Sequence, residues 1–413
     1  MGRFTFNSEA DNVIFDNYSD RPFAFTPLVG LRGERPVLVL PNDRALIDRG
    51  TWVLAIDGKP VIEFEVLRRM LCEINHKVAS KRAAPTDGER AKRRKLLSPA
   101  EEYVYTSVVG RNRSGNPIFY VNDGETLFCS GFQLKRQKTI FENRNVLVWR
   151  GEYHGLHGKE ECVVKTLKSG DRDPVEVAQV WEREYDILKA VQYHPNIVRL
   201  VGADFRLHSF YLEHIDAKAL SNQMKSNTSF TGTREDARRI MRDIASALAQ
   251  IHAKGFAHGD VKPGNILYGP EHGAVLIDLG TAFPIIDPAR FGGTPWYMPP
   301  EFTRNYQLRG APGDVFALAV TSGWLTGHLQ FPEKTWESWH IADIHPDEPT
   351  EGHRQAMDAM SHWLKHVRIA QSNLRETDPL ENVIFKALDA DRKTRISAAM
   401  ICEELDRINL MDD

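Results

Sequence analysis

The chain has 413 residues, of which 42% are hydrophobic and 26% are charged, and its formal net charge at pH 7 is −3. This length favours two domains, and the composition is that of a globular protein with enough apolar residues for a large core. The small net charge excludes a global attraction to nucleic acid or to anionic membranes, so such a partner would need a local patch.

The cysteines and the hydropathy pattern exclude further classes. Cys72, Cys129, Cys162 and Cys402 lie far apart without a C-x-x-C pair, which argues against a disulfide framework and a tetrahedral zinc site. The first residues lack the apolar core of a signal peptide, and no run of about 18 apolar residues predicts a membrane helix. We therefore expect an intracellular protein with no membrane partner and no specific nucleic-acid partner.

The first 130 residues predict a small module, either mixed α/β or β-rich, whose function the sequence does not identify. Residues 36–41 and 52–56 have the apolar runs of strands, and Asp57-Gly58 predicts a hairpin turn before Val61-Ile62. Apolar residues at helical spacing predict one amphipathic helix over residues 63–78. Further short strands are expected at residues 103–105, 118–121 and 126–128.

A basic segment interrupts this module. Residues 80–99 have no apolar period and predict a flexible loop. Lys81-Arg82 and, nine residues later, the basic run that ends at Lys95 resemble a bipartite nuclear import signal. The resemblance implies an import receptor as partner and a nuclear or nucleocytoplasmic location, whereas a solvated charged linker is the alternative.

The first chemical motif is a strand that ends in lysine. Cys162-Val163-Val164-Lys165 resembles the V-A-I-K strand of protein kinases, in which the ammonium pairs with the phosphates of ATP. A lysine at the end of a strand is a weak signal by itself. A helical pattern from Trp181 to Val191 carries Glu184, and His-Pro-Asn-Ile-Val follows at 194–198. This order resembles the kinase C-helix and implies that Glu184 holds Lys165 in place.

The decisive motif extends from His258 to Leu267, with the sequence HGDVKPGNIL. It resembles the kinase catalytic loop H-R-D-L-K-P-x-N. The resemblance implies that Asp260 is the catalytic base, that Lys262 stabilises the transferred phosphoryl group and that Asn265 binds magnesium. The apolar strand before Asp278-Leu279-Gly280 resembles the strand that precedes D-F-G, which implies Asp278 as the main magnesium ligand.

Three later motifs resemble architectural parts of the same family. They are the end of the activation segment at 293–301, the start of the central helix at 314–318, and a D-x-x-x-R-x-S-A element at 391–398. The family resemblance implies an α+β bilobal protein kinase fold over residues 135–410, with a buried ion pair between Glu301 and Arg395. Asp314 would anchor the backbone of the catalytic loop.

The resemblance also implies ATP and Mg²⁺ as cofactors and protein hydroxyls as substrates. Lys262 and Thr294 favour serine and threonine over tyrosine. The residues that would surround the nucleotide, in addition to Lys165, are Val148, Val163, Leu212, Glu213, Ile215 and Leu267.

Two positions depart from the family pattern. Phe141, Asn143 and Val146 stand where the glycine-rich loop has its glycines, which predicts a stiffer loop and weaker nucleotide binding. Gly259 replaces the arginine that grips an activation-loop phosphate in the family, and Thr281 is the only hydroxyl residue between Gly280 and Gly292. We therefore hypothesise that activity does not require activation-loop phosphorylation.

Three functions remain open from the sequence. An active serine/threonine protein kinase fits the complete set of catalytic residues. A pseudokinase that acts as a binding scaffold fits the altered glycine-rich loop. A small-molecule phosphotransferase fits the H-G-D motif, although Lys262, Arg395 and the segment 293–301 are features of protein-substrate kinases.

Overall fold

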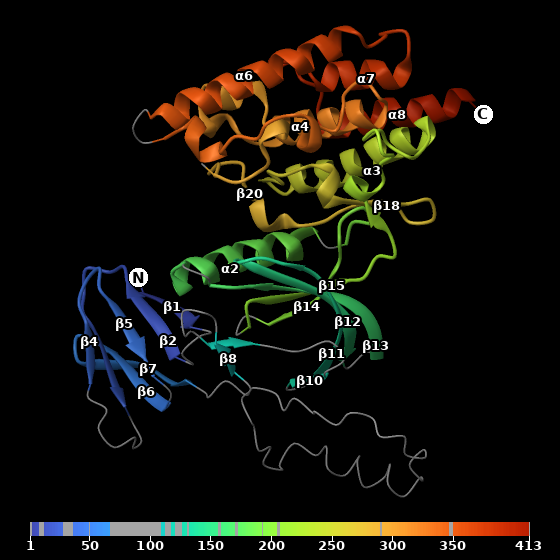
Figure 1. Ribbon diagram of the computed structural model, residues 1–413. Coiled ribbons are helices and arrows are strands. Elements are labelled where there is room, and N and C mark those ends of the chain that lie inside the picture. The colour runs from blue at the N-terminus through green and yellow to red at the C-terminus, as the bar shows by residue number, and fades with distance from the viewer. Residues whose placement is uncertain are drawn as a thin grey trace, which may run out of the picture. The chain divides into compact units, whose positions relative to one another are not determined.

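The computed structural model describes residues 2–7, 12–27, 36–48, 50–66, 109–111, 117–119, 126–129, 132–155, 158–169, 172–191, 193–204, 207–289, 291–346 and 350–412. The chain divides into two compact units (Figure 1). The first contains residues 1–181 and 201–214, and the second contains residues 182–200 and 215–413. Within these described ranges, none of the helices combines the length and hydropathy that a bilayer span requires.

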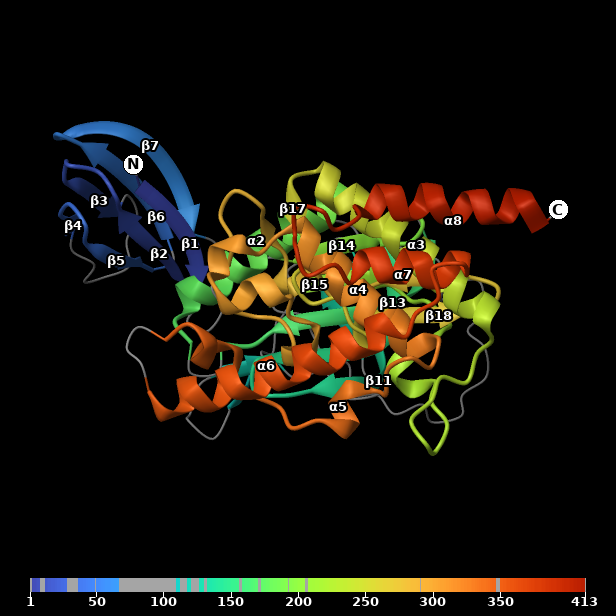
Figure 2. The same cartoon turned by 90° about the horizontal axis from the view of Figure 1, so that it is seen from above.

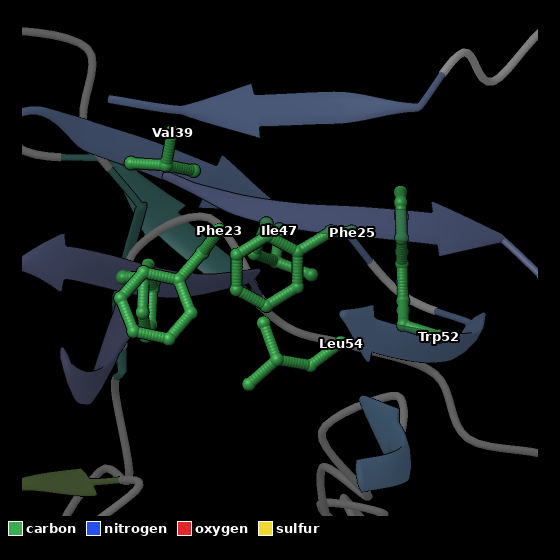
Figure 3. Close-up of a cluster of buried hydrophobic side chains, with 7 residues drawn as sticks. Phe23, Phe25, Val39, Ile47, Trp52 and Leu54 are labelled. Atoms are coloured by element: carbon green, nitrogen blue, oxygen red, sulfur yellow. The ribbon is translucent and has the colours of Figure 1, made fainter. Parts of the chain in front are cut away.

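The N-terminal part of the first unit consists of two small antiparallel sheets. One has the order β1-β2-β5 and the other the order β4-β3-β6-β7. Alternate residues of their strands point to one face, so that aromatic and branched side chains gather in a shared core. This core contains Phe15, Phe23, Phe25, Val39, Ile47, Trp52 and Leu54 (Figure 3). The strands are β1 (Gly2–Asn7), β2 (Asn12–Asn17), β3 (Phe23–Pro27), β4 (Val37–Val39), β5 (Arg44–Ile47), β6 (Gly50–Ile56) and β7 (Lys59–Val66).

The predicted hairpin is confirmed, but the predicted helix after it is wrong where the structure describes it. Asp57 and Gly58 have positive φ angles of 51° and 73° and connect β6 to β7, as a tight hairpin turn requires. Residues 63–66, expected to begin a helix, lie in β7, where Phe64 pairs with Trp52. Glutamate alternates with apolar residues in this segment, a pattern that suits a strand. Pairing with β6 therefore stabilises a strand here rather than a helix. Residues 67–78 lie outside the described residues.

The strands predicted further along the module have mixed outcomes. Residues 80–99 and 103–105 lie outside the described residues. Two short strands, β8 (Val109–Arg111) and β9 (Pro117–Phe119), pair with each other, and β9 overlaps the strand expected at 118–121. The strand expected at 126–128 is β10 (Thr126–Cys129). The described part of residues 1–130 is therefore composed of strands and loops, which agrees with the β-rich alternative of the prediction.

The rest of the first unit contains a six-stranded sheet with the order β10-β11-β12-β13-β15-β14. One face packs Leu134, Leu147, Trp149, Cys162, Val164 and Tyr211 into a core. Helix α2 (Pro174–Val191) carries Trp181, which stacks on Phe210 of β15 with ring centroids 5.3 Å apart. The other strands of this sheet are β11 (Phe132–Glu142), β12 (Val146–Gly155), β13 (Gly158–Leu167), β14 (Leu200–Asp204) and β15 (Ser209–Glu213).

The second unit is mainly helical and is built around α4 (Ala311–Leu325), of which residues 314–325 are all buried. Helices α3 (Arg234–Ala253) and α7 (Pro379–Ala387) pack against α4, and α8 (Ala398–Asp412) runs along α3 (Figures 1 and 2). Short strands beside these helices carry the loops with the predicted catalytic motifs. They are β16 (Lys218–Ala219), β17 (Phe256–Ala257), β18 (Ile266–Gly269), β19 (Gly273–Leu276) and β20 (Phe283–Pro284), and the remaining helices are α5 (Pro332–Thr335) and α6 (Glu351–Ser372).

The predicted ion pair between Glu301 and Arg395 is confirmed. The two guanidinium Nη atoms donate to the two carboxylate oxygens at 2.8 and 2.9 Å, and both side chains are buried. Arg395 also donates to the carbonyl oxygens of Pro312 and Asp389 at 2.7 and 2.8 Å. Because Pro312 lies in the first turn of α4, this one side chain links the start of α4, the segment before α8 and the end of the activation segment.

Arg395→Met should lower the free energy of unfolding by about 3–5 kcal/mol, because it leaves the Glu301 carboxylate buried without its cation. Urea denaturation would measure the change. Arg407→Met is the matched control, since the Arg407 side chain is 68% exposed and pairs with Glu403 one helical turn away, a contact worth about 0.5 kcal/mol or less. Equal losses in the two variants would contradict the structural role of Arg395.

Candidate active site

The catalytic loop is fixed to the centre of the second unit by Asp314 of α4. The Asp314 carboxylate, 3% exposed, accepts hydrogen bonds from the backbone N–H groups of His258 and Gly259 at 2.8 and 2.9 Å. Nε2 of His252 on α3 lies 2.8 Å from the same carboxylate. Burial alone would raise the pKa of Asp314, but the hydrogen bonds from His252 and Gly259 hold it below the ordinary value. The predicted anchor is therefore present and ionised at neutral pH.

Asp260 lies at the centre of a hydrogen-bonded group of four side chains. Thr294 donates to Oδ1 of Asp260 at 2.6 Å, and Nζ of Lys262 lies 2.9 Å from Oδ2. Lys262 also donates to the hydroxyl of Thr294 at 2.7 Å. Nδ2 of Asn265 donates to Oδ2 of Asp260 at 3.0 Å and to its carbonyl oxygen at 2.8 Å. The structure thus brings together three of the predicted site residues and adds Thr294.

Asp278 lies just after β19 in an unusual backbone conformation. Its φ and ψ angles are 63° and 78°, and its carboxylate accepts a hydrogen bond from the N–H of Gly280 at 3.3 Å. A left-handed non-glycine residue costs on the order of 1 kcal/mol or more and tends to occur at functional sites. Leu279 is buried, as expected for an apolar residue in place of the family's phenylalanine. The N–H of Ile277 donates to the carbonyl oxygen of Asn265 at 2.9 Å, which aligns the two segments.

The side chains of Asn265 and Asp278 suit a hard divalent cation. Both hydrogen bonds to Asp260 use the amide nitrogen of Asn265, which leaves the amide oxygen for a metal ion. The exposed Asp278 provides a carboxylate. Over the ranges that the structure describes, no group of three or more His, Cys, Asp or Glu side chains is placed to hold a metal. Mg²⁺ commonly takes several of its ligands from phosphate oxygens and water, so two protein ligands suffice for such a site.

Four predicted residues of the first unit lie on one face of the six-stranded sheet. Val148 is directly opposite Lys165 on β12 and β13, and Val163 is directly opposite Leu212 on β13 and β15. This face is opposite to the one that forms the core, because neighbouring residues of a strand point to opposite faces. Lys165 is 7% exposed, a degree of burial that lysine reaches mainly when it is paired.

Other predicted residues lie near or beyond the boundary between the two units. Glu213 ends β15 in the first unit, and the second unit resumes at Ile215. Leu267 lies on β18 of the second unit. Glu184 of α2, 3% exposed, also belongs to the second unit. Since Lys165 belongs to the first unit, its pairing with Glu184 stays a prediction.

The segment in place of the glycine-rich loop is a closed hairpin between β11 and β12. The side-chain oxygen of Asn143 accepts hydrogen bonds from the backbone N–H groups of Asn145 and Val146, both at 2.8 Å. The N–H of Asn143 donates to the carbonyl oxygen of Val146 at 3.0 Å, and the N–H of Lys168 donates to that of Asn145 at 2.7 Å. Two amides at the tip thus bond to a side chain of the hairpin itself, whereas a glycine-rich loop offers its amides to phosphate.

The sequence and geometry agree with a family-level comparison. A family model described as "Protein kinase domain" matches residues 153–405, more than half of the chain. The chain belongs to the protein kinase family. The match includes Lys165, the catalytic loop, Asp278 and the pair formed by Glu301 and Arg395, and it excludes the N-terminal sheets.

Individual relatives align with less than half of the chain. This kinase is 34% identical over 172 residues to the mitogen-activated protein kinase kinase kinase YODA of Arabidopsis thaliana, covering 39% of this chain and 19% of the relative. It is 30% identical over 186 residues to "Probable serine/threonine-protein kinase MARK-A" of Dictyostelium discoideum (43% and 17%). CBL-interacting protein kinase 25 of Oryza sativa subsp. japonica is 28% identical over 197 residues (44% and 38%). The chain therefore spans less than two fifths of the length of these relatives.

Thr294→Ala should lower kcat for peptide phosphorylation by about 10- to 100-fold, because Asp260 and Lys262 lose the hydroxyl that connects them. Thr294→Ser is the matched control, since it keeps the hydroxyl and should retain most of the activity. Initial rates with a degenerate serine/threonine peptide mixture at saturating ATP-Mg²⁺ would measure both variants. A Thr294→Ser variant as inactive as Thr294→Ala would show that the methyl group, and not the hydroxyl, is required.

Proposed function

We propose that this protein kinase transfers the γ-phosphoryl group of ATP to serine and threonine hydroxyl groups of protein substrates, with Mg²⁺ as cofactor. The observation that carries the proposal is the hydrogen-bonded group of Asp260, Lys262, Asn265 and Thr294, anchored through Asp314. Each member bonds to Asp260 at 2.6–3.0 Å, so the carboxylate is held in one orientation.

The chemistry assigned to the four residues follows from their charges and hydrogen bonds. Asp260 would accept the proton of the substrate hydroxyl, since a carboxylate oxygen can act as a general base. Lys262 would stabilise the negative charge of the transferred group. Asn265 and Asp278 would hold magnesium, which when bound neutralises phosphate charge and orients the phosphates for in-line transfer.

The preference for serine and threonine rests on Thr294 and Lys262. Their side chains are hydrogen-bonded at 2.7 Å, and both contact the proposed base. The resemblance associates this lysine and threonine with serine/threonine kinases, and the MARK-A relative is named as a probable serine/threonine-protein kinase. The substrate proteins are not identified by these residues.

One observation favours the alternative of a pseudokinase that acts as a scaffold. The hairpin closed by Asn143 bonds two tip amides internally, so they are not presented to a nucleotide. No comparable observation favours a small-molecule phosphotransferase. The pair of Glu301 and Arg395 stabilises the end of the activation segment, which in the family forms the platform for protein substrates.

Asp260→Asn and Asp278→Asn should each lower phosphotransfer by about 10²- to 10⁴-fold, because the first removes the base and the second a metal-binding carboxylate. The measurement is transfer of labelled phosphate from ATP-Mg²⁺ to a generic basic protein. Asp287→Asn, which changes an exposed carboxylate of the activation segment, is the matched control and should retain full activity.

The outcomes separate the three functions. Transfer by the wild type and the control, lost in both test variants, supports the protein kinase. An inactive wild type that also fails to bind nucleotide supports the pseudokinase. Transfer to small molecules but not to protein supports the third function.

We also propose that the basic segment from Lys81 to Lys95, which lies outside the described residues, binds an import receptor and directs the protein to the nucleus. Its two basic clusters and their spacing support the proposal. Alanine in place of Lys92, Arg93, Arg94 and Lys95 should reduce the nuclear fraction of a fluorescent fusion severalfold, because a receptor that reads both clusters loses one of them. Alanine at Glu101 and Glu102 is the control, and an unchanged nuclear signal in the basic-cluster variant would refute the proposal.

A further inference from the structure

Arg309 is a buried cation that binds the main chain of the activation segment. Its side chain lies just before α4, and the residue is 5% exposed. Nη1 donates to the carbonyl oxygens of Ala289 and Phe291 at 2.8 and 3.0 Å. Nη2 donates to that of Gly292 at 3.0 Å and to that of Gly259 in the catalytic loop at 3.3 Å. One guanidinium group therefore connects the activation segment to the catalytic loop.

The backbone conformation at Gly292 and Gly293 places main-chain carbonyl groups within hydrogen-bonding distance of this guanidinium. Their φ angles are 93° and 102°, which residues with a Cβ rarely adopt. A Cβ at position 293 would lie 2.8 Å from the carbonyl oxygen of Gly259. The two glycines thus allow the activation segment to turn sharply against the catalytic loop, and Arg309 bonds to the carbonyl groups at that turn.

The charge of Arg309 is stabilised by carbonyl oxygens, by aromatic rings and, through longer-range attraction, by the carboxylates of Asp314 and Asp260. Among the residues that the structure describes, the guanidinium forms no ion pair, and its hydrogen bonds all go to carbonyl oxygens. It lies over the rings of Phe283 and Phe302, at 4.9 and 5.7 Å from the centroids. Burial lowers the pKa of Arg309 to about 10, so it stays protonated at neutral pH. Its Nη atoms therefore donate, as a charged group, to main-chain carbonyl oxygens.

The catalytic loop itself has no cation at the position where the family has one. At Gly259, φ is 77°, and a Cβ would lie 2.8 Å from the carbonyl oxygen of Thr281 and 2.9 Å from the ring of Phe283. The hydroxyl of Thr281 donates to the carbonyl oxygen of His258 at 3.2 Å. Position 259 thus lacks the arginine that binds a phosphate in the family, whereas Arg309 bonds to the main chain of the activation segment.

We propose that Arg309 is a positioning residue that holds the activation segment in its substrate-binding arrangement through main-chain carbonyl groups, in place of a phosphate. This proposal rests on the proposed kinase activity. Arg309 contacts the carbonyl oxygen of Gly259, the residue before the base, and Gly292, two residues before Thr294. Loss of Arg309 would therefore loosen the part of the segment that delivers Thr294 to Asp260.

The test compares Arg309→Met, Arg309→Lys and, as matched control, Arg304→Met, which changes an exposed arginine of the same loop. In Arg309→Met, amide hydrogen exchange over residues 285–293 should become about tenfold faster or more, while exchange within α4 stays unchanged. The kcat/KM for a degenerate serine/threonine peptide mixture should fall about 10- to 100-fold, with the Kd for ATP-Mg²⁺ altered less than about threefold. Arg309→Lys keeps the charge with fewer donors and should fall between the wild type and Arg309→Met in both measurements.

A second arm tests the replacement of phosphate directly. Wild-type protein treated with phosphatase, and shown by mass spectrometry to carry no phosphate on Thr281, should keep its full activity. Loss of activity on this treatment would overturn the proposal, and so would unchanged exchange over residues 285–293 in Arg309→Met. Equal acceleration of exchange throughout the second unit would also overturn it, because Arg309 would then be a general stabilising residue.

The exchange measurement needs no catalysis and separates this proposal from the proposed function. An inactive wild type with a segment that depends on Arg309 would refute the kinase activity and leave the role of Arg309 in the backbone intact. An active wild type with a segment indifferent to Arg309 would refute the positioning role alone.

Discussion

The site depends on the burial of one carboxylate, that of Asp314, inside the helical unit. An ionised group so deep in a protein is costly unless donors surround it, and two loop amides and His252 provide them. The same bonds fix the backbone at His258 and Gly259, so Asp260 follows at a defined position. Substituting the carboxylate would therefore affect the packing of α4 and the geometry of catalysis together.

Residues in and after the activation segment also hold the catalytic loop in place. Thr294 bonds to the side chain of Asp260, whereas Arg309 bonds to the carbonyl oxygen of Gly259. Arg395 connects the end of the same segment to the start of α4. Asp314, Arg309 and Arg395 thus each use a buried charge to hold backbone groups, and α4, or the residues just before it, takes part in all three contacts.

The sequence predicted those parts of the fold and site whose residues form a recognisable local motif. The strands before Lys165 and Asp278, the hairpin at Asp57 and the pair of Glu301 and Arg395 have recognisable order and spacing. The helix expected from residue 63 was wrong at its start because β7 gains its stability from pairing with β6, which helical periodicity does not register. Arg309 was not predicted, because its partners are carbonyl groups, which every residue has, and such contacts leave no complementary residue type in the sequence. The role of Asn143 was missed for a related reason, since its side chain bonds to neighbouring amides only in the folded turn.

The closed hairpin and the complete catalytic loop have different energetic consequences. Phosphate contacts from a glycine-rich loop act on the nucleotide in the ground state as well as in the transition state, so their loss chiefly weakens nucleotide binding and raises KM. In the proposed function, Asp260, Lys262 and Asn265 would contact the groups whose charge and protonation change during transfer, and their loss would lower kcat. In this chain the altered element is the hairpin at Asn143, which would affect nucleotide binding. The retained contacts are those around Asp260, which would affect kcat. A scaffold protein does not require Thr294 and Lys262 to bond to the carboxylate of Asp260. A kinase requires these contacts even if its affinity for ATP is modest. The balance of these contacts therefore favours the proposed catalytic function over the scaffold function.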